Sequence, residues 1–258
     1  MRASSKPISE RAMSDAAATA AETTPGTTQL SVRDLNGWYG ESHVLHGVSF
    51  DVRPGEVVTL LGRNGAGKTS TLRAIMGLLP RREGSISFEG RELLGLPPRQ
   101  IARAGIAFCP EERGIFSTLS VDENLMLPPV VRPGGLGREE VLEMFPNLRE
   151  RLSSQGTKLS GGEQQMLAIA RILRTGAKFL LLDEPTEGLA PVIVQQIGRT
   201  LAMLKARGFT IVLVEQNFRF AASVADRHYV VEQGRVIDMI PNADLTANTA
   251  KLHAYLGM

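Results

Sequence analysis

The segment GRNGAGKT at residues 62–69 constrains the fold of this chain more than any other feature. It matches the pattern G-x-x-x-x-G-K-[ST], in which glycines let successive backbone N–H groups point at phosphate oxygens. A continuous apolar run, VVTLLG at residues 57–62, precedes it, and the segment TSTLRAIMGLL, with helical character, follows it. This order of strand, loop and helix predicts an α/β nucleotide-binding fold, because the following helix adds its positive end to the site.

The residue types of this loop predict how it binds a nucleotide. Lys68 places a positive charge on the terminal phosphates, and Thr69 offers a hydroxyl group to Mg²⁺. A glycine-rich turn that only joins a strand to a helix is the alternative, but the match stands between the buried strand and the helix that a binding site requires. We therefore expect the segment and the next residue to contact the nucleotide: Gly62, Arg63, Asn64, Gly65, Ala66, Gly67, Lys68, Thr69 and Ser70.

Other segments predict how the chain is organised. The unbroken apolar runs KFLLLDE (178–184) and FTIVLVEQ (209–216) are typical of parallel strands covered on both faces, with a crossover helix between them that Gly208 closes. Residues 30–56 alternate apolar and polar side chains, which indicates antiparallel strands. Residues 229–240 predict a hairpin, and a helix is expected at the end of the chain.

Two regions lack the sequence pattern of a β-sheet. Residues from about 107 to 165 contain short apolar clusters, prolines and the segment PGGLG, which predict a helical insertion. Residues 1–29 are rich in Ala, Ser and Thr and have almost no large apolar residues, so we expect a disordered tail. The expected division is a tail at 1–29 and one principal domain at 30–258.

Composition excludes several classes of function. The chain has 29 Lys and Arg against 27 Asp and Glu, so a net charge of +2 gives no electrostatic case for a nucleic-acid partner. Its single cysteine, Cys109, cannot form an internal disulfide, which favours a reducing, cytosolic setting, and its four histidines lack metal-ligand spacing. No apolar run approaches the roughly 20 residues that span a bilayer, so this chain is not expected to form a membrane pore alone.

An acidic pair follows one of the predicted strands. In LLLDEP, Asp183 and Glu184 stand where the strand emerges, at the edge of an open α/β sheet that binds ligands. One carboxylate can hold Mg²⁺ through water, and the next can polarise an attacking water molecule. An ordinary acidic turn before Pro185 is the alternative, but a phosphate-binding loop in the same chain favours the catalytic interpretation.

A second glycine motif, LSGGEQQ at residues 159–165, begins another predicted helix. Ser160 and Glu163 fit a capping box, which alone would explain both residues. Capping does not explain Gly161 and Gly162, which are poor helix formers in a first turn. The pair predicts a helix end that an anion can approach closely.

Together these segments resemble the ATP-binding cassette family of transporter ATPases, from about Leu30 to the C-terminus. The resemblance implies a P-loop NTPase core with a mostly parallel sheet, an antiparallel β subdomain and an inserted helical subdomain. It also implies a head-to-tail dimer in which ATP lies between residues 62–69 of one cassette and residues 160–163 of the other. ATP binding would close the dimer, and hydrolysis would release it.

The resemblance assigns further roles one by one. Tyr39 in GWYG matches the aromatic residue that stacks on adenine, although a strand aromatic that only packs in the sheet is the alternative. Val44 is expected to flank the base or the ribose. Glu184 matches the catalytic carboxylate, and Asp183 matches the one that supports Mg²⁺.

Three positions depart from the usual pattern of the family. Glu111 replaces a glutamine that contacts Mg²⁺ and the membrane subunit, and Ala190 replaces an aspartate after the acidic pair. Gln216 replaces the switch histidine: an amide can donate to the γ-phosphate, but it cannot become a cation. Reduced hydrolysis, in a module that mainly responds to bound nucleotide, is one interpretation, and surface polar residues at 111 and 216 are another.

The departures resemble one branch of the family. The stretches CPEERGIFSTLSVDENL, DEPTEGLAPVIVQQI, LVEQN and HAYLG together resemble the smaller ATPase of branched-chain amino-acid importers, the LivF type, and single pieces also occur in urea and amide importers. This implies an ATP-hydrolysing subunit on the cytoplasmic face of the inner membrane. Its partners would be a second cassette (a sister chain or an identical copy), two membrane permease subunits and, indirectly, a periplasmic solute-binding protein. A soluble cassette without a transport role is a further alternative.

Overall fold

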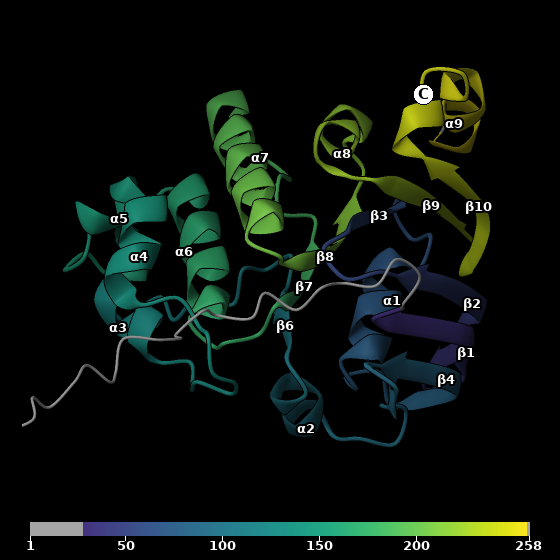
Figure 1. Cartoon of the computed structure of the whole chain (residues 1–258), viewed down its shortest axis with the longest axis horizontal. Coiled ribbons are helices and arrows are strands. Elements are labelled where there is room, and N and C mark those ends of the chain that lie inside the picture. The colour runs from purple at the N-terminus through teal and green to yellow at the C-terminus, as the bar shows by residue number, and fades with distance from the viewer. Residues whose placement is uncertain (1–27, 257–258) are drawn as a thin grey trace, which may run out of the picture.

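A six-stranded sheet forms the centre of the computed structural model, which describes residues 28 to 256 (Figure 1). Its strand order is β10-β9-β3-β8-β7-β6, and all neighbours are parallel except β9 and β10. Every residue of β3, β7 and β8 is buried, so the apolar runs that predicted parallel strands are confirmed. The strands are β3 (Val57–Leu61), β6 (Ile106–Cys109), β7 (Phe179–Asp183), β8 (Thr210–Glu215), β9 (Arg227–Glu232) and β10 (Arg235–Pro241).

A second, antiparallel sheet of four strands has the order β2-β1-β4-β5. Strands β1 (Leu30–Tyr39) and β2 (Ser42–Val52) confirm the antiparallel prediction for the N-terminal region. Strands β4 (Arg81–Phe88) and β5 (Arg91–Glu92) complete this sheet and were not predicted.

Alternate residues of the central strands enter two different cores. On one face, Leu180 and Leu182 of β7 and Leu213 of β8 join a cluster with the long helices. On the other face, Leu181 of β7 and Val214 of β8 join a cluster with the antiparallel sheet. The central strands β3, β7 and β8 are therefore covered on both faces, and their ends are the part available to a ligand.

Helices cover both faces of the central sheet. Figure 1 shows α7 (Pro191–Ala206) and α8 (Phe218–Val224) on one side, and α1 (Lys68–Ile75) and α2 (Pro98–Arg103) on the other. The predicted crossover helix is α7, and Gly208 after it has a φ of +76°. The end of the chain holds a 3₁₀ turn, η2 (Asn242–Asp244), and α9 (Thr249–Leu256), which confirms the terminal helix as far as the structure describes it.

The helical region is smaller than predicted at its start. Residues 106–109 form the edge strand β6, so the expected boundary at about 107 falls within the sheet. The helices that gather at one end of the molecule in Figure 1 begin only at Val121. They are α3 (Val121–Met126), α4 (Arg138–Met144), α5 (Pro146–Arg149), η1 (Gly156–Lys158) and α6 (Gly161–Leu173).

Two further points concern the whole chain. The predicted tail at 1–29 lies, up to residue 27, outside the described residues. Across residues 28 to 256, no helix is both long and apolar enough to cross a membrane.

Candidate active site

A pocket of about 460 Å³ opens where β3 leads into the phosphate-binding loop and where β7 leads into the acidic pair. It is lined by residues from four separate segments of the chain. Ten of the eleven lining residues were predicted from the sequence, and Glu187 is the exception. The lining residues are Val44, Asn64, Gly65, Ala66, Gly67, Lys68, Thr69, Ser70, Glu111, Glu184 and Glu187.

Backbone contacts fix the shape of the phosphate-binding loop. Gly67, the N-cap of α1, has a φ of +102°, a conformation that favours glycine. A Cβ atom at Gly62 would clash with the carbonyl oxygen of Val231, so this position also requires glycine. The N–H of Gly234, in the β9–β10 turn, donates to the carbonyl of Ala66 at 2.8 Å. The hairpin of β9 and β10 therefore supports the phosphate-binding loop.

Lys68 lies beneath this loop with only 4% of its surface exposed. Its Nζ donates to the carbonyl oxygens of Gly62 at 2.9 Å and Arg63 at 3.1 Å. The same Nζ lies 3.2 Å from Oε1 of Glu184. The positive charge predicted to meet the terminal phosphates is thus held next to the predicted catalytic carboxylate.

Thr69 and Asp183 form the predicted metal-supporting pair. The Thr69 hydroxyl donates to Oδ1 of Asp183 at 3.0 Å, while Oδ2 of Asp183 is buried and has no hydrogen-bond partner. Burial first, and the nearby carboxylates of Glu184 and Glu111 in addition, raise the pKa of Asp183 to about 6, although the hydrogen bond from Thr69 lowers it. An unpartnered oxygen in a negatively charged setting fits a site for a cation.

The predicted catalytic and switch residues contact each other. Nε2 of Gln216 donates to Oε2 of Glu184 at 2.6 Å. Glu184 has a φ of +44°, which is strained for a residue with a side chain, and its N–H donates to the carbonyl of Val214 at 3.0 Å. This contact places Gln216 beside the pocket through Glu184, and its role as the switch residue stays a prediction.

Glu187 adds a third glutamate to the pocket. Its pKa is raised mainly by partial burial, and the nearby carboxylates of Glu184 and Glu111 also contribute. Glu111 lines the same pocket, and its contact with Mg²⁺ stays a prediction. The one sequence signal for Glu187 was its place three residues after Glu184 in DEPTE. Loops have no regular pattern, so the sequence could not predict that this side chain points into the pocket.

Tyr39 lies at the end of β1, outside the residues that line the pocket. Its hydroxyl interacts with the guanidinium of Arg73 on α1, which raises the pKa of Arg73. Tyr39 is 38% exposed, so its ring is accessible. Val44 lines the pocket, but both its contact with the base or the ribose and the stacking of Tyr39 on adenine stay predictions.

Residues 160–163 lie at the start of α6, and none of them lines the phosphate pocket. The capping box is present: the Glu163 N–H donates to Ser160 Oγ, and the Ser160 N–H donates to Glu163 Oε2 at 2.7 Å. Gly162 is buried, and a Cβ atom there would lie 2.9 to 3.1 Å from side-chain atoms of Ile193 on α7. Packing against α7 therefore explains this glycine, whereas the three atoms nearest to a Cβ at Gly161 all belong to the Arg113 guanidinium, at 3.4 Å or more.

Ala190, the third departure, is the N-cap residue of α7 and makes no side-chain cap. An aspartate at an N-cap accepts a hydrogen bond from the first turn, so alanine leaves that end of α7 uncapped.

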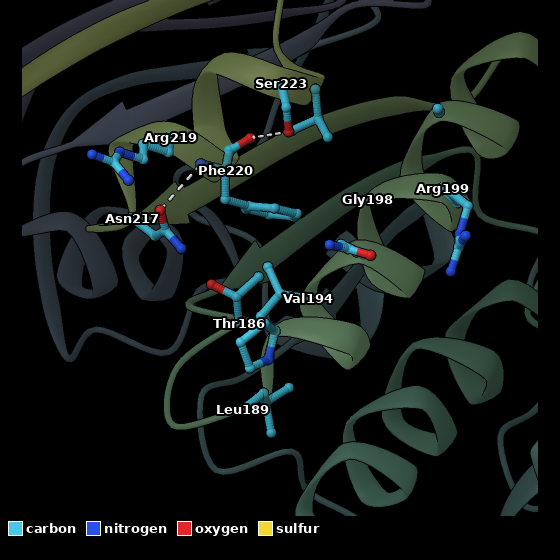
Figure 2. Close-up of a pocket in the computed structure, with 13 residues that line it drawn as sticks. Thr186, Leu189, Val194, Gly198, Arg199, Asn217, Arg219, Phe220 and Ser223 are labelled. Carbon is cyan, nitrogen blue, oxygen red and sulfur yellow. Dashed lines mark hydrogen bonds between the residues drawn. The ribbon is translucent and has the colours of Figure 1, made fainter.

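A larger pocket of about 940 Å³ lies between α7 and α8 (Figure 2). Its walls include Thr186 and Leu189, from the loop after the acidic pair, and Asn217, which follows Gln216. Asn217 caps α8 by accepting from the Phe220 N–H at 3.1 Å. The loop after Glu184 and the loop after β8 therefore meet at this pocket as well as at the phosphate site.

Comparisons with known proteins agree with this geometry. A profile of the family described as "ABC transporter" matches residues 45–187. The high-affinity branched-chain amino acid transport ATP-binding protein BraG of Pseudomonas aeruginosa is 46% identical over 231 residues, which are 88% of this chain and 99% of that protein. The lipopolysaccharide export system ATP-binding protein LptB of Escherichia coli K12 is 35% identical over 234 residues, 88% of this chain and 97% of that protein. A solved structure described as the ATP binding subunit of an ABC transporter has a TM-score of 0.75 and 30% identity, and the match covers 90% of this chain and 100% of that one.

Proposed function

Because the chain belongs to the ABC transporter family of ATP-binding proteins, we propose that it is the ATP-hydrolysing subunit of an importer for branched-chain amino acids. The observation that carries the catalytic part is the contact of Glu184 with both Lys68 and Gln216 at the phosphate pocket. The solute is inferred from the 46% identity to BraG, compared with 35% to LptB.

ATP binding follows from the phosphate-binding loop. Its backbone N–H groups and the positive end of α1 hold the phosphate oxygens, and Lys68 supplies a full positive charge. We assign the adenine to the side of the pocket near Val44, with Tyr39 stacking on it. Tyr39 and Val44 come from the antiparallel sheet, so this assignment gives that sheet a role in base binding.

The residues of the site fit Mg²⁺. Thr69 with its hydroxyl, Asp183 with its unpartnered Oδ2, and Glu111 are the residues that would hold the ion. In the part of the chain that the structure describes, no three or more His, Cys, Asp or Glu side chains form a site that could hold a metal ion by themselves. This agrees with Mg²⁺, which proteins usually hold through one or two carboxylates together with substrate phosphates. When bound, it would neutralise charge on the β- and γ-phosphates.

Hydrolysis is assigned to Glu184. Its carboxylate orients the attacking water and accepts the proton as the water oxygen attacks the γ-phosphorus. The amide of Gln216 fixes the direction of that carboxylate and can donate its other N–H to the γ-phosphate. Lys68, within reach of both the phosphates and Glu184, balances negative charge that develops between them.

The site is incomplete in one chain because residues 160–163 do not reach its own phosphate pocket. We propose that a second cassette, a sister chain or an identical copy, supplies Ser160, Gly161, Gly162 and Glu163 to the nucleotide. Two permease subunits would form the membrane path, and a periplasmic solute-binding protein would deliver the solute. The chain would then act as a peripheral subunit on the cytoplasmic face of the membrane.

Reconstitution tests this proposal. The chain is purified with the membrane proteins that accompany it, placed in vesicles, and supplied with ATP and labelled leucine or urea. We expect ATP-dependent uptake of leucine. Uptake of urea alone would assign the chain to a urea or amide importer, and recovery without any membrane partner would favour a cassette without a transport role.

A further inference from the structure

Glu215, the last residue of β8, is a buried acid that the mechanism above does not use. It is only 2% exposed, and no Lys, Arg or His side chain forms an ion pair with it within residues 28 to 256. Burial raises its pKa to about 7. A buried carboxyl group without a cation is costly, so its hydrogen bonds must account for its place in the core.

Both oxygens of Glu215 accept hydrogen bonds from the loops that meet at the site. The Thr186 hydroxyl donates to Oε1 at 2.7 Å, and the Thr186 backbone N–H also donates to the carboxyl group. The Asn217 N–H donates to Oε2 at 3.3 Å. Figure 2 shows Thr186 and Asn217 together on the wall of the larger pocket.

These two partners are close in sequence to the catalytic pair. Thr186 follows Glu184 by two residues, and Asn217 directly follows Gln216. The hydrogen bond between Gln216 and Glu184 joins the two loops at the phosphate pocket, and Glu215 joins the same loops below it. The distance between the amide and the catalytic carboxylate is therefore set from both sides.

The strained backbone of Glu184 explains why the second link between the two loops, through Glu215, is needed. A residue with a side chain at a φ of +44° keeps that conformation only when its surroundings hold it there. Hydrogen bonds hold the backbone on both sides of this residue. The N–H of Glu184 donates to the carbonyl of Val214, and two residues later Thr186 donates to Glu215. Without the second anchor the loop can relax and turn the carboxylate away from the water that it must orient.

We propose that Glu215 is a positioning residue for ATP hydrolysis, which acts by tying Thr186 to the loop that carries Gln216. This inference rests on the proposed ATPase activity of the site. Glu215 is not among the residues that line the phosphate pocket, and its carboxyl group accepts hydrogen bonds from Thr186 and Asn217, so its loss should lower kcat and leave the KM for ATP nearly unchanged.

The test compares threonine variants in the full chain assembled with its partners. Thr186→Val keeps the shape of a buried side chain but removes the hydroxyl, and we expect kcat to fall roughly tenfold or more, since a hydrogen bond to an acidic group is lost. Thr186→Ser keeps the hydroxyl and should restore most of the activity. Thr200→Val is the matched control, because Thr200 is equally buried but its hydroxyl bonds only to the Gln196 carbonyl within α7.

Glu215→Gln provides a second probe that introduces no cavity and no charge. Its amide group must place an N–H where the Thr186 or Asn217 donor now points, so kcat should fall while KM stays the same. Equal kcat in Thr186→Val and Thr200→Val would overturn the positioning role, as would a rise in KM that accounts for the whole loss of kcat/KM. If the unmodified assembly hydrolyses no ATP, the proposed function itself fails.

Discussion

Replacing each glycine of LSGGEQ by alanine separates packing from ligand approach at the start of α6. A Cβ atom at Gly162 would lie 2.9, 3.0 and 3.1 Å from three side-chain atoms of Ile193. Real Cβ atoms almost never lie closer than 3.0 Å to another heavy atom, and Ile193 is a β-branched residue in the first turn of α7 with little freedom to move. At Gly161 the nearest atom is Nη2 of Arg113 at 3.4 Å, the end of a flexible side chain.

The energies follow from these contacts. Overpacking a core position typically costs about 1–3 kcal/mol, and alanine gains up to about 1 kcal/mol over glycine in a helix. Gly162→Ala should therefore lower the free energy of unfolding by about 1 kcal/mol, whereas Gly161→Ala should leave it unchanged or raise it slightly. We expect a difference of about 1–3 kcal/mol between the two variants.

Urea denaturation followed by circular dichroism measures this difference, with ATP hydrolysis by the assembled transporter measured in parallel. Gly161→Ala should reduce hydrolysis without loss of stability, because its extra methyl group stands where an anion would approach. If Gly162→Ala is as stable as Gly161→Ala, the packing explanation for Gly162 is wrong. If both variants hydrolyse ATP normally, the approach of an anion to this helix end is refuted.

Four further predictions concern single residues. Glu184→Gln should retain ATP binding, shown by calorimetry, and lose hydrolysis; normal phosphate release would remove Glu184 from the catalytic role. Gln216→His should change kcat and its pH dependence with little change in ATP affinity, and identical pH profiles would contradict a role for the amide. Burial lowers the pKa of His228, so the folded chain binds fewer protons at this residue than the unfolded chain does. The free energy of unfolding should therefore fall as the pH drops below about 6.5, and it should fall less steeply in His228→Gln. Urea midpoints at several pH values would measure both curves. Burial raises the pKa of Cys109 to about 12, so a thiol reagent should label it only after urea unfolding, and rapid labelling of the folded chain would contradict its burial.

The sequence predicted the parts of the molecule that local patterns determine. The phosphate-binding loop depends on eight consecutive residues, and β3, β7 and β8 are continuous apolar runs, so each could be recognised without knowing its neighbours. Strand β6 could not, because a four-residue apolar cluster fits a strand or a buried helix equally well, and its partner β7 lies about 70 residues away.

The parts that were missed depend on contacts between distant segments. The reason for Gly162 is a side chain on another helix, and Glu187 is defined only by the pocket into which its loop folds. Glu215 was predicted only as one residue of the strand at 209–216; its carboxyl group is almost fully buried, where Thr186 and Asn217 from two loops supply hydrogen bonds. The position of Glu215 in the sequence predicted the strand to which it belongs, but not the burial of its side chain.

The brace between Gly234 and Ala66 has a consequence for how the chain matures. The phosphate-binding loop lies in the first third of the sequence, but the turn beneath it and the neighbouring strand β9 come from the last tenth or so of the chain. During synthesis, the pairing of β3 with β9 and the hydrogen bond from Gly234 to Ala66 can form only after residue 234 has left the ribosome. A ligand stabilises only the state that can bind it, so ATP would favour finished cassettes and give no help to truncated ones. Nucleotide binding would in that way distinguish complete cassettes from fragments.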